Sequence, residues 1–136
     1  MPKQTALFPL VHAPAGFPSP AEDYVDQRLD LNEHLIRNPA ATYFIRVQGD
    51  SMRGAGIASG DLLVVDRSLE AKPGHVVVAA VDGDLTVKRL KRLGSGLALA
   101  AENSAFQPIA LTGERAVEIW GVATHVIHGL TPCVSR

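Results

Sequence analysis

The sequence of 136 residues contains a single cysteine, Cys133, near its C-terminus. One cysteine cannot form a disulfide within the chain, so we expect a reducing, cytoplasmic setting. A nucleophilic thiol also needs a base and an orienting group, and nothing around Cys133 supplies them. We therefore interpret this cysteine as incidental.

A surplus of positive charge is also absent. Lysine and arginine number 13 against 14 aspartates and glutamates, which gives a formal net charge of −1. Because neutralising nucleic-acid phosphates requires basic residues in excess, this balance argues against direct binding to DNA as a general polyanion.

Long apolar runs are missing as well. Apolar runs such as residues 62–65 and 76–81 are far shorter than the roughly 20 residues of a membrane helix. The N-terminal segment has no sustained apolar core of the kind that a signal peptide requires. We expect neither a membrane span nor export.

The chain has enough apolar residues to fold as one domain. Hydrophobic residues make up 46% of it and charged residues 20%, so a buried core is expected. The 12 glycines and 9 prolines favour many turns and short elements over a helical bundle.

The first twenty residues contain five prolines, at positions 2, 9, 14, 18 and 20. Because proline disfavours helix at its own position and at the one before it, this segment is predicted to be an extended, accessible arm. Residues 19–22 have the form of a capping box with proline at the first helical position, which predicts a short helix after them. A second short helix is predicted to begin at Asp30 and to stop before the Asn38-Pro39 pair.

From residue 42 onward the pattern is that of strands. Asp82-Gly83 separates two apolar runs and predicts a tight hairpin turn, because this pair tolerates the positive φ angles of such turns. The expected strands are residues 43–47, 62–65, 76–81, 85–90, 97–100, 109–111 and 117–127. The sequence therefore predicts a mostly β fold with one or two short helices and an extended N-terminal arm.

Ser51 lies in a glycine-rich segment, residues 49–57, that follows a predicted strand. Such a position can present a side chain to a cleft, so Ser51 is a candidate nucleophile, although serine beside glycine is also an ordinary turn residue. The glycines match neither of the phosphate-binding patterns G-x-x-x-x-G-K-S/T and G-x-G-x-x-G, which argues against a nucleotide site.

The five histidines supply no recognisable partner for a nucleophile. None lies in a triad signature such as G-x-S-x-G. His125 and His128 are three residues apart in a predicted strand, so their side chains point to opposite faces. No cysteine or carboxylate cluster completes a metal site, and we expect neither a metal nor another cofactor.

Lys88 shares one face of its predicted strand with Thr86 and Leu90. A lysine removed from water has a lowered pKa, and a neutral lysine is a competent general base. The alternative is a solvated basic strand, since Arg89, Lys91 and Arg92 follow closely. Composition and spacing favour the solvated strand.

Several segments together carry a family resemblance: AGFPSPAEDYVDQRLDLNEHLI, GDSM, SGDLLVVD, VVVAAVDGDLTVK and GVATHVIH, in that order along the chain. They resemble the LexA-type serine–lysine self-cleaving peptidases, and among these the UmuD-type proteins of SOS mutagenesis. The resemblance covers residues 8–128, and the 37 residues that separate Ser51 from Lys88 match the family arrangement.

The resemblance implies a catalytic site on a LexA- or signal-peptidase-like β-rich fold. Ser51 would be the nucleophile and Lys88 the general base, with Thr86 holding the lysine amine. The backbone amides around Asp50 and Ser51 would stabilise the oxyanion.

The resemblance also implies which peptide bond is cleaved. The scissile bond would join Ala15 to Gly16, so that a removable arm, residues 1–15, precedes a peptidase domain, residues 16–136. Cleavage would be stimulated by the RecA filament on single-stranded DNA. The product would form a homodimer and serve a UmuC-like Y-family polymerase in error-prone translesion synthesis.

Two alternatives remain. A LexA-like repressor or antirepressor fragment could act by dimerisation without binding DNA, but the 15 residues before Gly16 are too few for a helix-turn-helix module. A signal-peptidase-like hydrolase shares the serine–lysine chemistry and would need a membrane anchor. We therefore expect the UmuD-type function.

Overall fold

The computed structural model describes residues 8–11 and 25–131. These residues belong to two units, Met1–Arg37 and Asn38–Arg136, each with its own contacts. In the first unit, β1 (Phe8–Val11) pairs antiparallel with β2 (Val25–Leu29). The extended conformation predicted from the prolines is present in β1.

The helix predicted from the capping box at residues 19–22 falls on a segment that the structure does not describe. Residues 12–24 lie outside the described residues, and from Val25 the chain is strand rather than helix. Pairing with β1 supplies the backbone hydrogen bonds that a helix would otherwise provide, and a local capping signal cannot reveal that pairing.

The second predicted helix is confirmed as α1 (Leu31–Leu35). The Asp30 carboxylate caps it by accepting a 2.9 Å hydrogen bond from the Asn32 backbone N–H. It is shorter than expected, because Ile36 already has extended backbone angles.

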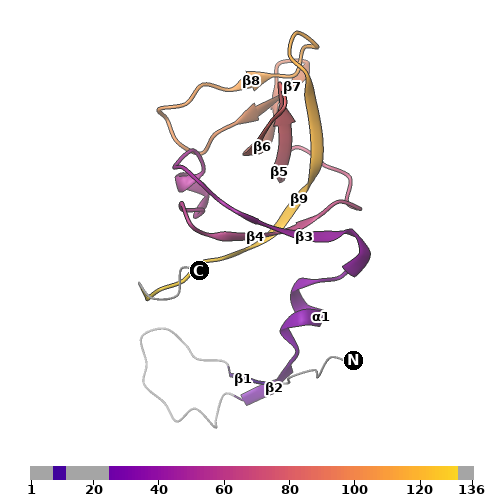
Figure 1. Ribbon diagram of the computed structural model, residues 1–136, viewed down its shortest axis with the longest axis vertical. Helices are drawn as coiled ribbons and strands as arrows, with labels where there is room; N and C mark the ends of the chain where they lie inside the picture. Colours follow the sequence, from indigo (N-terminus) through magenta and orange to yellow (C-terminus); the bar gives the residue numbers. More distant parts are fainter. Residues whose placement is uncertain (1–7, 12–24, 132–136) are drawn as a thin grey trace. The chain divides into compact units, whose positions relative to one another are not determined.

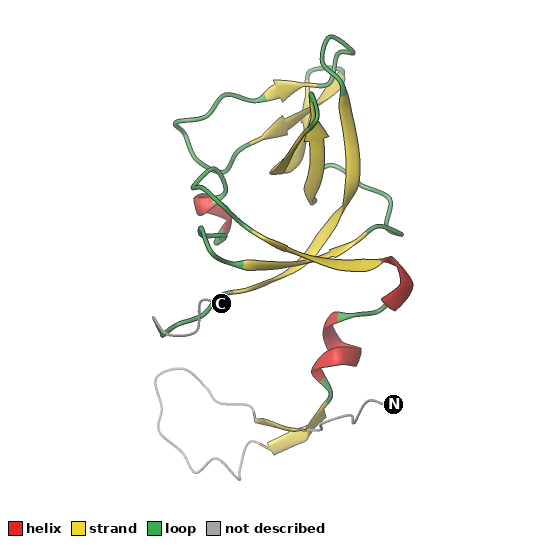
Figure 2. Ribbon diagram, in the orientation of Figure 1, coloured by secondary structure: helices red, strands yellow, loops and turns green. Residues whose placement is uncertain are grey.

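The second unit is an antiparallel sheet of seven strands, as Figures 1 and 2 show. Their spatial order is β3-β4-β9-β5-β6-β7-β8. The strands are β3 (Thr42–Arg46), β4 (Leu62–Asp66), β5 (Val76–Val81), β6 (Asp84–Leu93), β7 (Gly96–Ala100), β8 (Ile109–Ala110) and β9 (Val117–Ile127). Two 3-10 turns, η2 (Pro39–Ala41) and η3 (Arg53–Ala55), precede β3 and β4. The mostly β prediction is confirmed.

The long strand β9 connects the two halves of this sheet (Figure 1). It pairs with β4 near its end and with β5 near its start. Gly121 lies at this crossing, where a Cβ atom would come within 2.7 Å of a Val65 methyl group. A glycine is therefore needed for β9 to pass so close to β4.

Two apolar clusters form the core, and β5 contributes to both. Val78 faces the cluster that contains Val47, Met52, Ile57, Leu63 and Val65, whereas the alternate residues Val77, Ala79 and Val81 face the cluster with Leu90, Leu99 and Val122. This alternation is the strand period of two, with both faces of β5 buried.

The β5–β6 hairpin has the predicted turn. Val81 pairs with Asp84, and the two residues between them, Asp82 and Gly83, have φ angles of 51° and 90°. Positive φ at both central positions identifies a type I′ turn, whose twist matches the flanking strands. The hairpin fixes the start of β6, which carries Thr86 and Lys88.

Candidate active site

Ser51 lies in the loop between β3 and β4, next to one of the most deeply buried side chains of the protein. Met52 is only 1% exposed and belongs to the first apolar cluster. The Met52 carbonyl accepts hydrogen bonds from the N–H groups of Ala55 and Ile57. Burial of Met52 therefore anchors the loop and holds the neighbouring Ser51 at a fixed position.

Lys88 lies on β6, opposite Val77 of β5. Its Nζ atom is 3.0 Å from Ser51 Oγ, although the two residues are 37 positions apart in the sequence. Nζ also contacts Thr86 Oγ1 at 2.8 Å and the Val87 carbonyl oxygen at 3.2 Å. The structure thus brings together the three side chains singled out from the sequence.

Burial lowers the pKa of the Lys88 ammonium, because the charged form loses hydration. None of the ion pairs among the described residues includes Lys88. Its neighbour Arg89 instead pairs with the Glu102 carboxylate. The solvated-strand interpretation therefore fails for Lys88, while Lys91 and Arg92 are indeed exposed.

The contacts of Lys88 can be satisfied by a neutral amine as well as by an ammonium. An ammonium carries three N–H donors and no acceptor, whereas a neutral amine carries two donors and one lone pair. Thr86 Oγ1 and the Val87 carbonyl can accept the two donors. The lone pair is then free to accept the proton of the Ser51 hydroxyl.

A cleft of about 450 Å³ opens beside Ser51. Its wall includes Phe44 and Leu85, which are 48% and 53% exposed. The remaining lining residues are Ile45, Arg46, Val47, Gln48, Ser51, Met52, Val78, Thr86 and Val87. Among the described strands, β3 lies at the end of the sheet, so its outer edge at this cleft can pair with an extended peptide.

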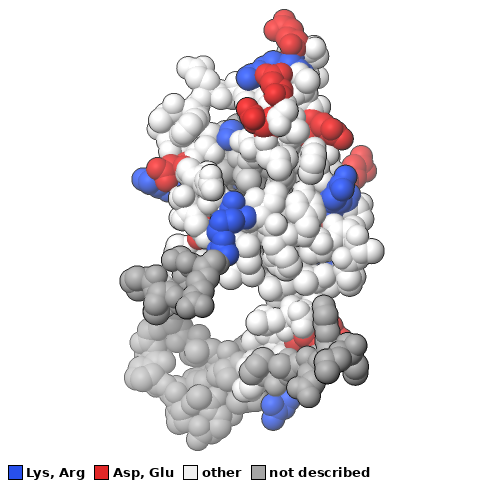
Figure 3. Space-filling model, in the orientation of Figure 1, with Lys and Arg blue, Asp and Glu red and all other residues white. Residues whose placement is uncertain are grey.

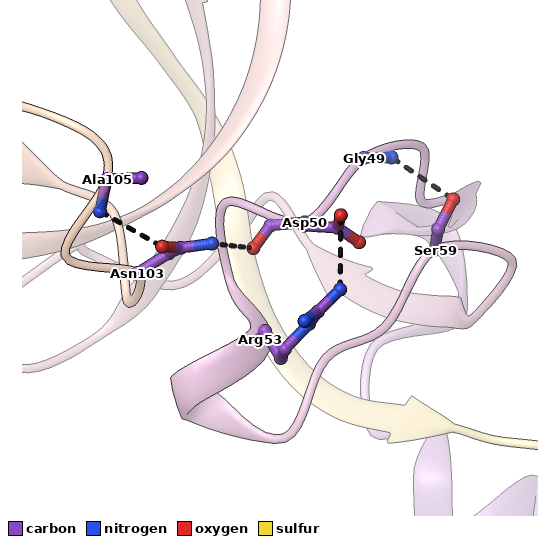
Figure 4. Close-up of polar contacts among 6 residues, drawn as sticks. All are labelled: Gly49, Asp50, Arg53, Ser59, Asn103 and Ala105. Atoms are coloured by element: carbon purple, nitrogen blue, oxygen red, sulfur yellow. Dashed lines mark hydrogen bonds and ion pairs between the residues drawn. The ribbon is translucent and has the colours of Figure 1, made fainter.

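The loop that carries Ser51 is held by a second loop, residues 101–106, which sequence reasoning missed. Asn103 Nδ2 donates a 3.0 Å hydrogen bond to the Asp50 carbonyl oxygen (Figure 4). The Gly54 N–H donates to the Glu102 carbonyl oxygen at 2.6 Å. These contacts join residues about fifty positions apart, so no local motif could have revealed them.

The histidines take no comparable position. His128 Nδ1 is 2.5 Å from the buried Asp61 carboxylate, which makes it a partner of the turn before β4. His125 contacts Thr124. Among residues 8–11 and 25–131, no group of three or more histidine, cysteine, aspartate or glutamate side chains could hold a metal ion.

The remaining sequence-predicted residues are not described. Ala15, Gly16 and Cys133 lie outside residues 8–11 and 25–131. Within those ranges, no helix has both the length and the apolar character needed to cross a membrane.

Comparison with known proteins identifies the family. The model of the family described as Peptidase S24-like matches residues 9–124. Protein ImpA of Salmonella typhimurium is 47% identical over 120 residues, which cover 84% of this chain and 77% of that protein. Protein SamA of the same species is 50% identical over 115 residues, 85% of this chain and 79% of its own length. Protein MucA of Escherichia coli is 48% identical over 119 residues, 87% and 81% of the two chains.

The family match and the relatives cover most of the chain, including strand β6 and the β3–β4 loop, which form the serine–lysine contact. The chain therefore belongs to the peptidase S24-like family, and it is a self-cleaving serine peptidase of the UmuD type.

Proposed function

We propose that Ser51 and Lys88 form the catalytic dyad and that they cleave the chain's own Ala15–Gly16 bond. The cut separates the arm, residues 1–15, from the peptidase domain, residues 16–136. The observation that carries this proposal is the 3.0 Å contact between Lys88 Nζ and Ser51 Oγ beside an open cleft. The lowered pKa of Lys88 supports it further, because it raises the fraction of neutral amine.

In the first step, neutral Lys88 accepts the hydroxyl proton while Ser51 Oγ attacks the Ala15 carbonyl carbon. The carbonyl oxygen becomes an oxyanion, and the backbone N–H groups of Asp50 and Ser51 stabilise it. The Lys88 ammonium then protonates the Gly16 nitrogen. The peptide bond breaks, and Ala15 remains as an ester on Ser51.

In the second step, Lys88 is neutral again and accepts a proton from water. The resulting hydroxide attacks the Ala15 ester, and Lys88 returns the proton to Ser51 Oγ as the arm leaves with a free carboxylate. Thr86 Oγ1 and the Val87 carbonyl accept hydrogen bonds from the amine in both steps, which keeps Nζ directed at Ser51.

The features of the cleft suit the proposed bond. Ala15 and Gly16 are small residues, which a cleft lined by Met52 can admit close to Ser51. Exposed Phe44 and Leu85 offer apolar contact to neighbouring residues of the arm. The outer edge of β3, the end strand among the described residues, offers backbone hydrogen bonds to an extended segment.

We further propose that a RecA filament on single-stranded DNA stimulates this cleavage, in the cytoplasm. The product, residues 16–136, then forms a homodimer and serves as accessory subunit of a UmuC-like Y-family polymerase in error-prone translesion synthesis. The near-neutral charge supports indirect contact with DNA. On the face of the described residues drawn in Figure 3, positive and negative side chains lie interspersed and form no basic patch.

Intact-mass spectrometry tests the proposed function. Incubation of the purified protein with RecA, ATP and single-stranded DNA is expected to remove a mass equal to residues 1–15, and omission of the DNA should slow this loss at least tenfold. Cleavage at any other bond would contradict the assignment of Ala15–Gly16.

The cleaved product then serves as bait for its partner. It is expected to retain a purified Y-family polymerase of the UmuC type on an affinity column, whereas a purified DNA-damage repressor should pass through. Retention of the repressor instead of the polymerase would favour the repressor-like alternative.

A further inference from the structure

The peptide group between Asp50 and Ser51 is fixed by a side chain from a distant loop. We propose that Asn103 is a positioning residue of the active site, which orients this peptide so that the Ser51 N–H can stabilise the oxyanion. The inference rests on the proposed function, because it concerns the same reaction. It adds a residue outside the nucleophile loop and the β6 strand.

The orientation of Asn103 is itself determined by its contacts. Its Oδ1 atom accepts a 3.0 Å hydrogen bond from the Ala105 N–H, so its Nδ2 group points the other way. Nδ2 then donates to the Asp50 carbonyl oxygen at 3.0 Å (Figure 4). The same oxygen accepts a longer bond, 3.2 Å, from the Arg53 N–H. Two donors therefore hold one carbonyl.

Fixing that carbonyl also fixes the Ser51 N–H. The peptide group is planar and no cis bond occurs among the described residues, so the N–H of Ser51 is directed opposite to the Asp50 carbonyl. Among residues 8–11 and 25–131, this N–H has no hydrogen-bond partner, and Ser51 lines the cleft. A free donor in a fixed direction beside the nucleophile is what oxyanion stabilisation requires.

The loop that carries Asn103 is held firmly on both sides. Gly54 approaches so closely that a Cβ atom there would lie 2.5 Å from the Glu102 carbonyl oxygen. The Glu102 carboxylate pairs with Arg89, the residue that follows Lys88 on β6. The loop therefore ties the strand that bears the base to the loop that bears the nucleophile.

Two substitutions at Asn103 separate the effect of its Nδ2 donor, which contacts Asp50, from the effect of its Oδ1 acceptor, which contacts Ala105. Asn103→Asp keeps an oxygen for the Ala105 N–H but loses the donor to Asp50, whereas Asn103→Leu loses both and adds no charge. Ser104→Ala is the matched control, because this neighbour is exposed. We compare self-cleavage rates over a range of alkaline pH values and thermal unfolding of all four proteins.

Both Asn103 variants are expected to lower the maximal cleavage rate by about tenfold to a hundredfold, since a displaced oxyanion donor costs up to about 10²–10³. Asn103→Leu should leave the pH of the half-maximal rate unchanged, because Lys88 keeps its contacts. A wild-type rate in Asn103→Asp would overturn the proposal, as would a shifted half-maximal pH in Asn103→Leu.

A spectroscopic readout decides the proposal even if the protein fails to cleave itself. The ¹H–¹⁵N NMR resonance of the Ser51 amide is expected to shift in Asn103→Asp and in Asn103→Leu and to stay in place in Ser104→Ala. An unmoved Ser51 resonance in both Asn103 variants would overturn the proposed positioning. Absence of cleavage in the wild type would instead contradict only the proposed function.

Discussion

Ser51→Ala protein is expected to remain intact under conditions that convert the wild type completely, which corresponds to a rate loss of at least about 10⁴-fold. The substitution removes the hydroxyl that Lys88 Nζ contacts at 3.0 Å beside the cleft, and with it the proposed nucleophile. Met52 keeps the loop buried, so the fold should persist.

The controls for this variant are a second serine substitution and a mixing experiment. Ser104→Ala, at an exposed position, should cleave at the wild-type rate. Adding the active domain, residues 16–136, to Ser51→Ala protein separates cleavage between molecules from cleavage within one. Self-cleavage of Ser51→Ala protein alone would contradict its assignment as nucleophile.

Lys88→Met is expected to reduce self-cleavage by about 10²-fold to 10⁴-fold, because a general base contributes that much and no other base contacts Ser51 in the described residues. Methionine fills a similar volume without a titratable group. Lys88→Arg is the charge-retaining control and should be equally inactive, because a guanidinium stays protonated. Mass spectrometry follows the loss of residues 1–15 in each variant.

Lys88→Met should also stabilise the fold at neutral pH. The pKa of Lys88 is lower in the folded protein than in the unfolded chain, so the unfolded state binds more protons between the two values. The resulting loss of folding stability is present in full below the pKa of Lys88 in the folded protein. It disappears as the pH rises towards the pKa of Lys88 in the unfolded chain. Lys88→Met should therefore unfold at a higher temperature than the wild type at pH 7, and a lower one would contradict the burial argument.

The strands were predictable because their signals are local. Alternating or continuous apolar runs between turn residues located β3 to β9, and Asp82-Gly83 identified the hairpin that orients β6. The pairing order was not predictable. It depends on close approaches such as that of Gly121 to Val65, which only the folded chain reveals. The strand at Val25–Leu29 was missed for the same reason, since its partner is β1.

The pairing of Ser51 with Lys88 was predictable from the family resemblance that the ordered motifs carry, whereas physical reasoning on Lys88 alone favoured a solvated strand over a buried base. Burial decides between them, and burial depends on how the Ser51 loop packs against β6. Asn103 carried no signal at all. An asparagine before a small residue is an ordinary turn former, and its contact with Asp50 arises only when the two loops meet.

If a neutral Lys88 activates Ser51, the rate of self-cleavage must follow the deprotonation of this lysine as the pH rises. Without RecA, the first-order rate should rise about tenfold for each pH unit and level off above the pKa of Lys88, below the pH at which an ordinary lysine loses its proton. Intact-mass spectrometry of samples incubated between pH 6 and pH 11 measures this rate. The wild-type rate is expected to show this rise and plateau, and the Lys88→Met rate is expected to show neither. A rate independent of pH, or the same rise in Lys88→Met, would contradict it.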